Sequence, residues 1–188
     1  MKCDAPIRTP VEFNSRRSST VKVLIAYEDY RVGHWTKQLF DRLQCRLEAG
    51  QFLSVLFWKF DVLRFHQLKE LAVDDAAEAH VSVFAGYNNA DLPAFVKTWI
   101  RQWSPRKDRG SCSLVALLGA PEEPTPKQGD IGSFLQHTAR WSGLDFIVCN
   151  AVFSQFKPSP ALEDVAAAVQ KVLPHADEAF RPIAWAAC

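Results

Sequence analysis

The sequence predicts a doubly wound α/β fold, in which helices cover both faces of a five-stranded parallel sheet. Short apolar runs rich in β-branched residues alternate with segments whose apolar residues recur at helical spacing, and there are five of each. The runs are apolar on both faces, as a sheet buried between two helical layers requires. A chain of 188 residues is long enough for one core and short for two. One main domain is therefore expected.

The repeating unit is clearest in residues 80–103. Residues 81–85 form an apolar run, and Gly86 to Asn89 break it with residues that tolerate turn conformations. From Leu92 to Trp103 the apolar residues fall on one helical face. Asp91 is expected to be the N-cap of this helix, with Pro93 in its first turn.

The other elements follow from the same two patterns. Strands are expected at 21–27, 52–60, 112–118 and 145–152, and helices carry the apolar residues of 35–47, 68–79, 131–138 and 162–173. Gly50 is expected to close the first helix as its C-cap. Around the domain, 21–173, residues 1–20 are expected to be an N-terminal tail or strap, and 174–188 a C-terminal segment packing back on the domain.

For five such units the commonest strand order is 2-1-3-4-5, which makes the prediction a flavodoxin-like doubly wound three-layer sandwich. In this order the first and third strands are neighbours, and the helices that follow them leave on opposite faces. A ligand belongs in the crevice between these departures. Here the crevice would be lined by residues 28–31, 86–89 and 119–132.

The segment after the third strand resembles that of the flavodoxin-like FMN reductases. In that family a Tyr-Asn motif with a following Pro, and a helix with Lys and Trp, packs on the flavin ring. Residues 87–99 are similar, with Tyr87, Asn88 and Asn89 before Pro93 and with Lys97 and Trp99 in the helix. The resemblance implies that FMN could bind here, with Gly86, Tyr87, Asn88 and Asn89 as cofactor-binding residues.

An FMN site also needs a phosphate cradle of backbone N–H groups at the helix that follows the first strand. At that point the chain has Glu28 and Asp29, whose carboxylates would repel a phosphate. The cradle would have to form further on, from Arg31, Gly33 and Thr36.

The same acidic pair resembles that of the response-regulator receivers, and Lys157-Pro158 is similar to their Lys-Pro motif. The phosphate-accepting Asp has no counterpart, because the third strand ends in Gly86-Tyr87-Asn88. Glu28 and Asp29 could still bind Mg²⁺, which needs only one or two carboxylates besides water.

Composition and charge indicate which classes of partner are expected. The 22 Lys and Arg residues against 21 Asp and Glu give a net charge of +1, which does not favour nucleic acid as a partner. Neither a signal-peptide core nor an 18-residue apolar run is present, so no membrane partner and a cytoplasmic location are expected. Trp99 and Trp103 are interpreted as core residues, with a homodimer face as the alternative.

The leading hypothesis is a non-catalytic ligand-binding, signalling or interaction module that uses the crevice between the first and third strands. Its partner would be an unknown small molecule or protein. The alternatives are an FMN-dependent oxidoreductase of the flavodoxin-like reductase type and a Mg²⁺-binding degenerate receiver.

Overall fold

The computed structural model describes residues 19–88, 91–108, 110–120, 131–153 and 160–176. Within them lie strands β1 (Ser19–Tyr27), β2 (Gln51–Lys59), β3 (Val81–Tyr87), β4 (Ser113–Gly119) and β5 (Asp145–Ala151). The helices are α1 (Tyr30–Gln44), α2 (His66–Glu78), α3 (Ala94–Trp103), α4 (Ile131–Ser142) and α5 (Pro160–Val172). Short 3-10 turns lie at Phe60–Arg64, Ser104–Arg106 and Leu173–His175.

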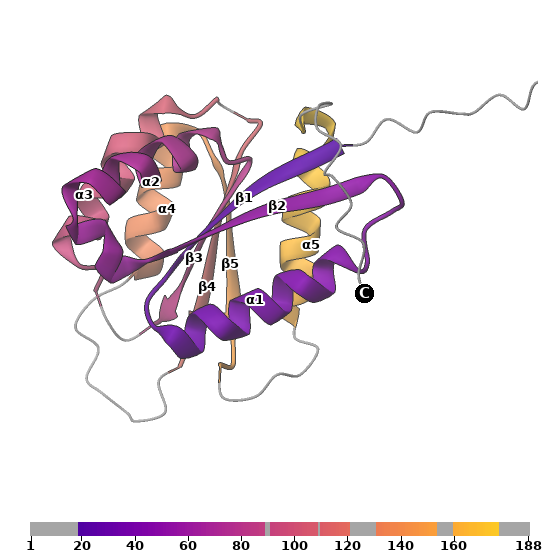
Figure 1. The fold of residues 1–188 in the computed structure, drawn as a ribbon, viewed down its shortest axis with the longest axis horizontal. Helices are drawn as coiled ribbons and strands as arrows, with labels where there is room; N and C mark the ends of the chain where they lie inside the picture. The colour runs from indigo at the N-terminus through magenta and orange to yellow at the C-terminus, as the bar shows by residue number, and fades with distance from the viewer. Residues whose placement is uncertain (1–18, 89–90, 109, 121–130, 154–159, 177–188) are drawn as a thin grey trace, which may run out of the picture.

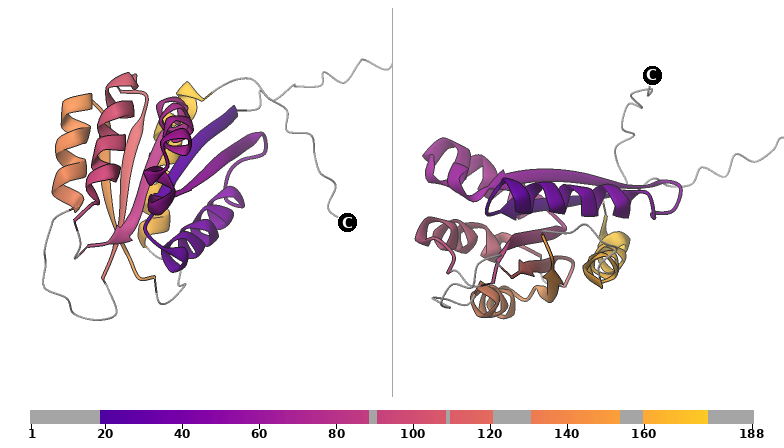
Figure 2. Two further views of the ribbon diagram at one scale, coloured as in Figure 1. Left: turned by 60° about the vertical axis from the view of Figure 1, so that its left-hand side comes forward. Right: turned by 90° about the horizontal axis from the view of Figure 1, so that it is seen from below.

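The five strands form one parallel sheet in the order β2-β1-β3-β4-β5 (Figure 1), which confirms the predicted topology. Side chains alternate between the two faces along each strand. Val23 and Ile25 of β1 face the layer of α1 and α5, whereas Leu24 and Ala26 face the layer of α2, α3 and α4. Figure 2 shows the two helical layers on opposite sides of the sheet.

Trp99 and Trp103 lie in the second of these layers and have no exposed surface. Their ring centroids lie 5.9 and 6.4 Å from that of Phe84 on β3. Burial of large aromatic side chains against a central strand contributes strongly to a core. The interpretation of both tryptophans as core residues is therefore confirmed, and a dimer face would have to use other side chains.

Two helix ends differ from the prediction. Helix α3 begins at Ala94 with Pro93 as its N-cap, and the Asp91 carboxylate instead accepts a hydrogen bond from Lys97 Nζ at 2.5 Å. Helix α1 ends at Gln44, and Gly50, with φ of 97°, lies in the turn before β2. The apolar pattern misplaced this second end because Leu47 packs on the core from outside the helix.

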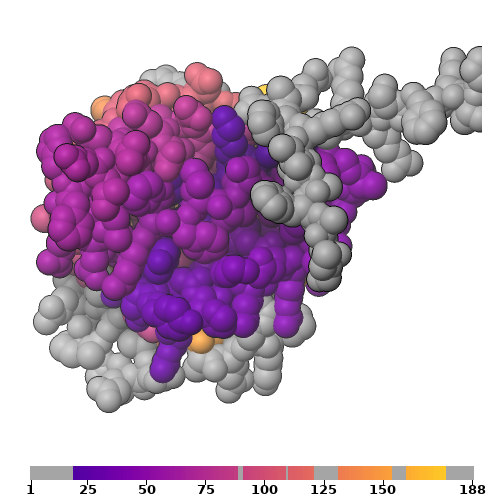
Figure 3. All heavy atoms as spheres, in the orientation of Figure 1, coloured from indigo at the N-terminus to yellow at the C-terminus, as the bar shows by residue number. Residues whose placement is uncertain are grey.

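Strand β2 is the most exposed strand of the sheet, with Leu56 44% and Phe57 38% exposed. In the space-filling view, residues 30–60, which include α1 and β2, lie at the surface that faces the viewer (Figure 3). None of the helices in the described ranges has the length and hydropathy needed to cross a membrane. The predicted strap at 1–20 and the predicted C-terminal segment at 174–188 lie mostly outside these ranges.

Candidate functional site

The turns that follow β1 and β3 meet at the carboxyl end of the sheet. Glu28 N donates a hydrogen bond to Ala85 O at 3.0 Å, and Glu28 Oε2 accepts one from Tyr87 N at 2.9 Å. Gly86 lies between these two bonds, and a Cβ atom at this position would come within 2.8 Å of Glu28 Oε2. A side chain at position 86 would therefore push the Glu28 carboxylate away from the position in which it accepts the bond from Tyr87 N.

Asp29 is the N-cap of α1. Its backbone is extended, and Oδ1 accepts a hydrogen bond from Val32 N at 2.9 Å. An aspartate at this position satisfies a backbone donor that has no partner within the helix, and its charge complements the helix dipole. The Asp29 side chain also forms a hydrogen bond with the Tyr87 side chain. The protein's own carboxylate thus lies where an anionic ligand would meet the helix N-terminus.

We call the place where the turns after β1 and β3 meet, formed by Glu28, Asp29, Gly86 and Tyr87, the rim. Electrostatic interactions couple its Glu28, Asp29 and Tyr87 side chains. Burial raises the pKa of Glu28, the hydrogen bond from Tyr87 N opposes this rise, and the charge of Asp29 adds to it. Burial also raises the pKa of the Tyr87 phenol, and the Asp29 carboxylate adds to the rise through its charge and its hydrogen bond. The negative charge of Glu28 is therefore less favourable in the folded protein than in water.

The residues predicted to form a phosphate cradle do not all face the rim. Thr36 is fully buried, and its hydroxyl donates to Val32 O at 2.8 Å. Gly33 lies under the ring of Tyr27, because a Cβ atom there would be 2.6 Å from two ring carbons. Arg31, in the first turn of α1, is exposed.

The remaining predicted positions divide between the rim and undescribed segments. The structure brings Glu28, Asp29, Gly86 and Tyr87 together, and Asn88 is exposed beside them, with its N–H donating to Gly119 O at 2.9 Å. Outside the described residues lie Asn89, residues 121–130 of the loop after β4, and Lys157-Pro158. Within the described ranges no group of three His, Cys, Asp or Glu side chains could hold a metal ion, and Mg²⁺ binding to the acidic pair stays a prediction.

An aromatic hollow of about 340 Å³, which the sequence did not predict, lies beside the rim between α1 and β2. It is lined by Tyr27, Tyr30, Gly33, His34, Lys37 and Phe57. The rings of Tyr27 and Phe57 meet edge to face with centroids 6.2 Å apart, and those of Tyr30 and His34 stack at 6.0 Å. The spacing of Tyr30 and His34, four residues apart on one helix, was the available signal.

The parallel strand order β2-β1-β3-β4-β5, with helices on both faces of the sheet, defines a flavodoxin-like fold. No family model matches the sequence, and no curated protein is similar to it. Among solved structures, the chain is similar to a flavodoxin of Streptococcus pneumoniae TIGR4, with 10% identity and a TM-score of 0.51 over 84% of this chain and 99% of that one. It is also similar to a short-chain flavodoxin associated with a bacterial microcompartment, with 11% identity and a TM-score of 0.52 over 85% and 99%.

A putative quinone reductase from Klebsiella pneumoniae aligns with 14% identity and a TM-score of 0.45 over 82% of this chain and 84% of that one. At the identities of the two flavodoxins, the likeness establishes the fold. The predicted flavodoxin-like class is confirmed, and function has to be argued from the site itself.

Proposed function

We propose that the chain is a non-catalytic flavodoxin-like interaction module, whose rim between β1 and β3 receives a basic side chain of a protein partner. The observation that supports this most strongly is the hydrogen bond from Val32 N to the Asp29 carboxylate at 2.9 Å. It satisfies, from within the chain, one of the helix-terminal N–H donors that a nucleotide phosphate would use.

The charges of the rim also disfavour a flavin nucleotide. A phosphate at the N-terminus of α1 would lie beside the Asp29 and Glu28 carboxylates, and like charges at close range repel. Thr36 donates to Val32 O and Gly33 is covered by the Tyr27 ring, so of the predicted cradle only the exposed Arg31 is left to contact a phosphate. These contacts support a site without flavin.

The same features suit a cation. The two acidic residues directly precede Tyr30, which lines the aromatic hollow and is 81% exposed. Aromatic faces attract ammonium and guanidinium groups, and exposed aromatic side chains are enriched at the centres of protein interfaces. Lys37, which also lines the hollow, is paired with Asp41 at 2.6 Å, so its charge is already balanced. An Arg or Lys side chain of a partner fits this combination.

The second candidate is an FMN-dependent oxidoreductase of the flavodoxin-like reductase type, favoured by the resemblance of residues 87–99. Tyr87 and Asn88 do lie at the rim. However, the Tyr87 ring packs edge to face on the Phe153 ring, with centroids 5.6 Å apart, and the Tyr87 hydroxyl is hydrogen-bonded to the Asp29 side chain. Stacking on a flavin would have to compete with these contacts.

A titration with FMN separates the two candidates. We expect the visible absorption and fluorescence of FMN to remain those of the free cofactor when purified protein is added, with riboflavin as a control that lacks the phosphate. A yellow protein that retains FMN through gel filtration would reject the interaction module and support the oxidoreductase.

A second titration tests the cation site, with N-acetylarginine amide as the probe and N-acetylglutamine amide as its uncharged control. NMR shifts are expected at the rim for the arginine probe alone. Glu28→Gln should weaken binding about tenfold, in line with a charged hydrogen bond, while Glu70→Gln on α2 should leave it unchanged. Equal binding of both probes would contradict the proposal.

A further inference from the structure

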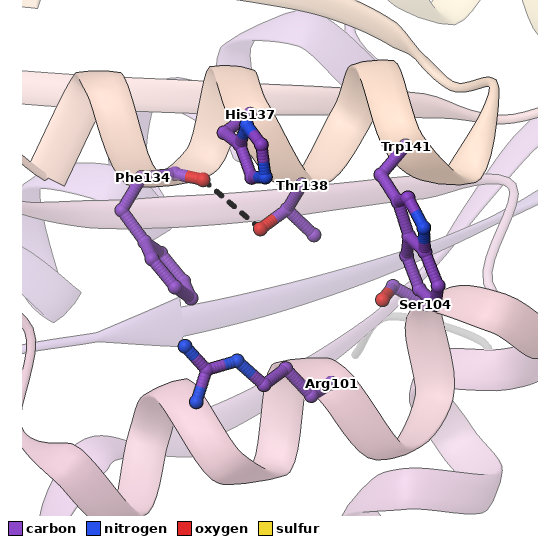
Figure 4. Close-up of a pocket in the computed structure, with 6 residues that line it drawn as sticks. All are labelled: Arg101, Ser104, Phe134, His137, Thr138 and Trp141. Carbon is purple, nitrogen blue, oxygen red and sulfur yellow. Dashed lines mark hydrogen bonds between the residues drawn. The ribbon is translucent and has the colours of Figure 1, made fainter.

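A second hollow lies between α3 and α4, in the layer of helices opposite α1. Its volume is about 360 Å³, and it is lined by Arg101, Ser104, Phe134, His137, Thr138 and Trp141. Figure 4 shows Arg101 reaching toward Phe134 at one end of the hollow and Ser104 beside Trp141 at the other. A space of this size matches the lower range of small-molecule sites.

Arg101 supplies a positive charge at one end. Its guanidinium carbon lies 5.6 Å from the centroid of the Phe134 ring, and no carboxylate pairs with it among the described residues. Lys97 also lies over this ring, at 5.4 Å, but it is paired with Asp91. A guanidinium without a carboxylate partner, held against an aromatic ring, is suited to bind a carboxylate.

Ser104 supplies an unused polar group at the other end. The residue is 1% exposed, and its hydroxyl has no hydrogen-bond partner among the described residues. A buried hydroxyl without a partner is unfavourable. Thr138, which also lines the hollow, differs because its hydroxyl donates to Phe134 O at 2.9 Å. The wall beside Trp141 thus offers a hydroxyl that a ligand could satisfy.

Trp141 and Phe134 supply the apolar surfaces. Trp141 is 64% exposed, whereas Trp99 and Trp103 on the facing helix are fully buried. Large aromatic side chains that remain at the surface beside a hollow are typical of binding sites. An aromatic ring between the two ends would cover Trp141 and remove its apolar surface from water.

We propose that this hollow binds a small aromatic carboxylate that carries a hydroxyl group at the far end of its ring. The carboxylate pairs with Arg101, the ring lies against Phe134 and Trp141, and the hydroxyl reaches Ser104. The site is separate from the β1–β3 rim, so it does not depend on the function proposed for that rim.

The test uses para-hydroxyphenylpropionate and two comparison compounds. Its amide lacks the charge, and phenylpropionate lacks the hydroxyl. Calorimetric titration should show the hydroxylated acid binding to the wild-type chain at least about tenfold more tightly than its amide, and a few-fold more tightly than phenylpropionate.

Matched variants assign the two ends. Arg101→Gln should abolish the preference for the acid over the amide, while Arg140→Gln, which removes the same charge from α4 outside the hollow, should preserve it. Ser104→Ala should abolish only the preference for the hydroxylated ring. Trp141→Ala should weaken all three compounds alike, and circular dichroism will show that each variant is folded.

Three results would overturn the proposal. They are no binding of the hydroxylated acid at millimolar concentration, equal binding of acid and amide to the wild-type chain, or equal losses in Arg101→Gln and Arg140→Gln. A Glu28→Gln chain should bind all three compounds as the wild type does, which keeps the outcome independent of the rim.

Discussion

The carboxylate of Glu28 accepts a hydrogen bond from the backbone N–H of Tyr87, and this bond joins the turn after β1 to the turn after β3 across 59 residues of sequence. Glu28 is only partly exposed, so the bond substitutes for water that the backbone N–H would otherwise bind. The Glu28 side chain therefore stabilises the local structure of the rim and also contributes to its negative charge.

Removing the acceptor should destabilise the protein, while removing only the charge should destabilise it much less. Glu28→Ala leaves Tyr87 N without its partner, and we expect the free energy of unfolding to fall by about 1–3 kcal/mol. Glu28→Gln keeps an acceptor oxygen, so its loss should be much smaller. Urea unfolding of both variants beside the wild type measures the difference, and equal losses would contradict the role given to this bond.

The pH dependence of the same pair follows from the raised pKa of Glu28. A carboxyl whose pKa is higher in the folded state stabilises the fold below its ordinary pKa, and this contribution is lost as the pH rises through the raised value. The stability of the wild type relative to Glu28→Gln should therefore decrease over the interval that begins near the ordinary glutamate pKa of 4.5 and extends to higher pH. A difference that increases over this interval would show that the ionised form is the favoured one.

Gly86 and Glu28 should be energetically coupled. A Cβ atom at position 86 would displace Glu28 Oε2, which lies 2.8 Å from it, so Gly86→Ala should break the bond to Tyr87 N and cost about 1–3 kcal/mol. In a Glu28→Ala background the obstacle is gone, and the same change should cost little. A double-mutant cycle should give a coupling above about 0.5 kcal/mol, whereas additive losses would exclude the contact as the cause.

Asp29 should act as a helix cap. Asp29→Ala removes the acceptor of the Val32 N–H, and an N-cap lost to alanine costs about 0.5–2 kcal/mol. Asp29→Asn and Asp29→Ser can still accept the bond and should retain most of the stability. Thermal unfolding of the three variants checks this order, and a loss in Asp29→Asn equal to that in Asp29→Ala would point to charge instead of capping.

Lys107 should make stability rise with pH in the alkaline range. Its side chain is buried over the Trp103 ring and donates to Ala79 O, and burial lowers its pKa from 10.5 to about 8. The unfolded chain binds the proton more tightly between these two values, so the free energy of unfolding gains on the order of 3 kcal/mol from this group as the pH rises across them.

Lys107→Met should remove that gain, so its unfolding free energy should rise less with pH than that of the wild type. Cys149 acts in the opposite direction, because burial raises the pKa of its thiol to about 12. For this reason the difference between variant and wild type is the quantity to measure, with Lys69→Met on α2 as the control. Parallel pH profiles for Lys107→Met and the wild type would contradict the expectation.

The fold could be predicted because its information is local. The alternation of apolar runs with helical stripes identified the strands and helices. The apolar run from Val81 to Ala85, for example, was correctly predicted as a buried strand. Helix ends were less predictable, since they depend on competing partners. Asp91 pairs with Lys97 instead of capping α3, and Leu47 extends the apolar pattern beyond the end of α1.

For the candidate site, the sequence could predict which two turns meet, because neighbouring parallel strands end at the same edge of the sheet. The sequence did not indicate where each side chain points. Asp29, predicted to line the crevice, turns back to its own helix, and Thr36, predicted to join the phosphate cradle, faces the interior. The hollow between Arg101 and Trp141 depends on how two helices pack against each other, and no local pattern encodes that arrangement.

The central strands β1, β3 and β4 are covered by helices on both faces, whereas β2 and β5 form the edges of the sheet. Amide hydrogens in the three inner strands should therefore exchange with deuterium most slowly, and those of the edges sooner through local opening. The turns at Glu28 and Tyr87 are anchored to this slowly exchanging centre. A partner that binds at these turns would meet a surface that is already ordered, so binding would cost this protein little conformational entropy.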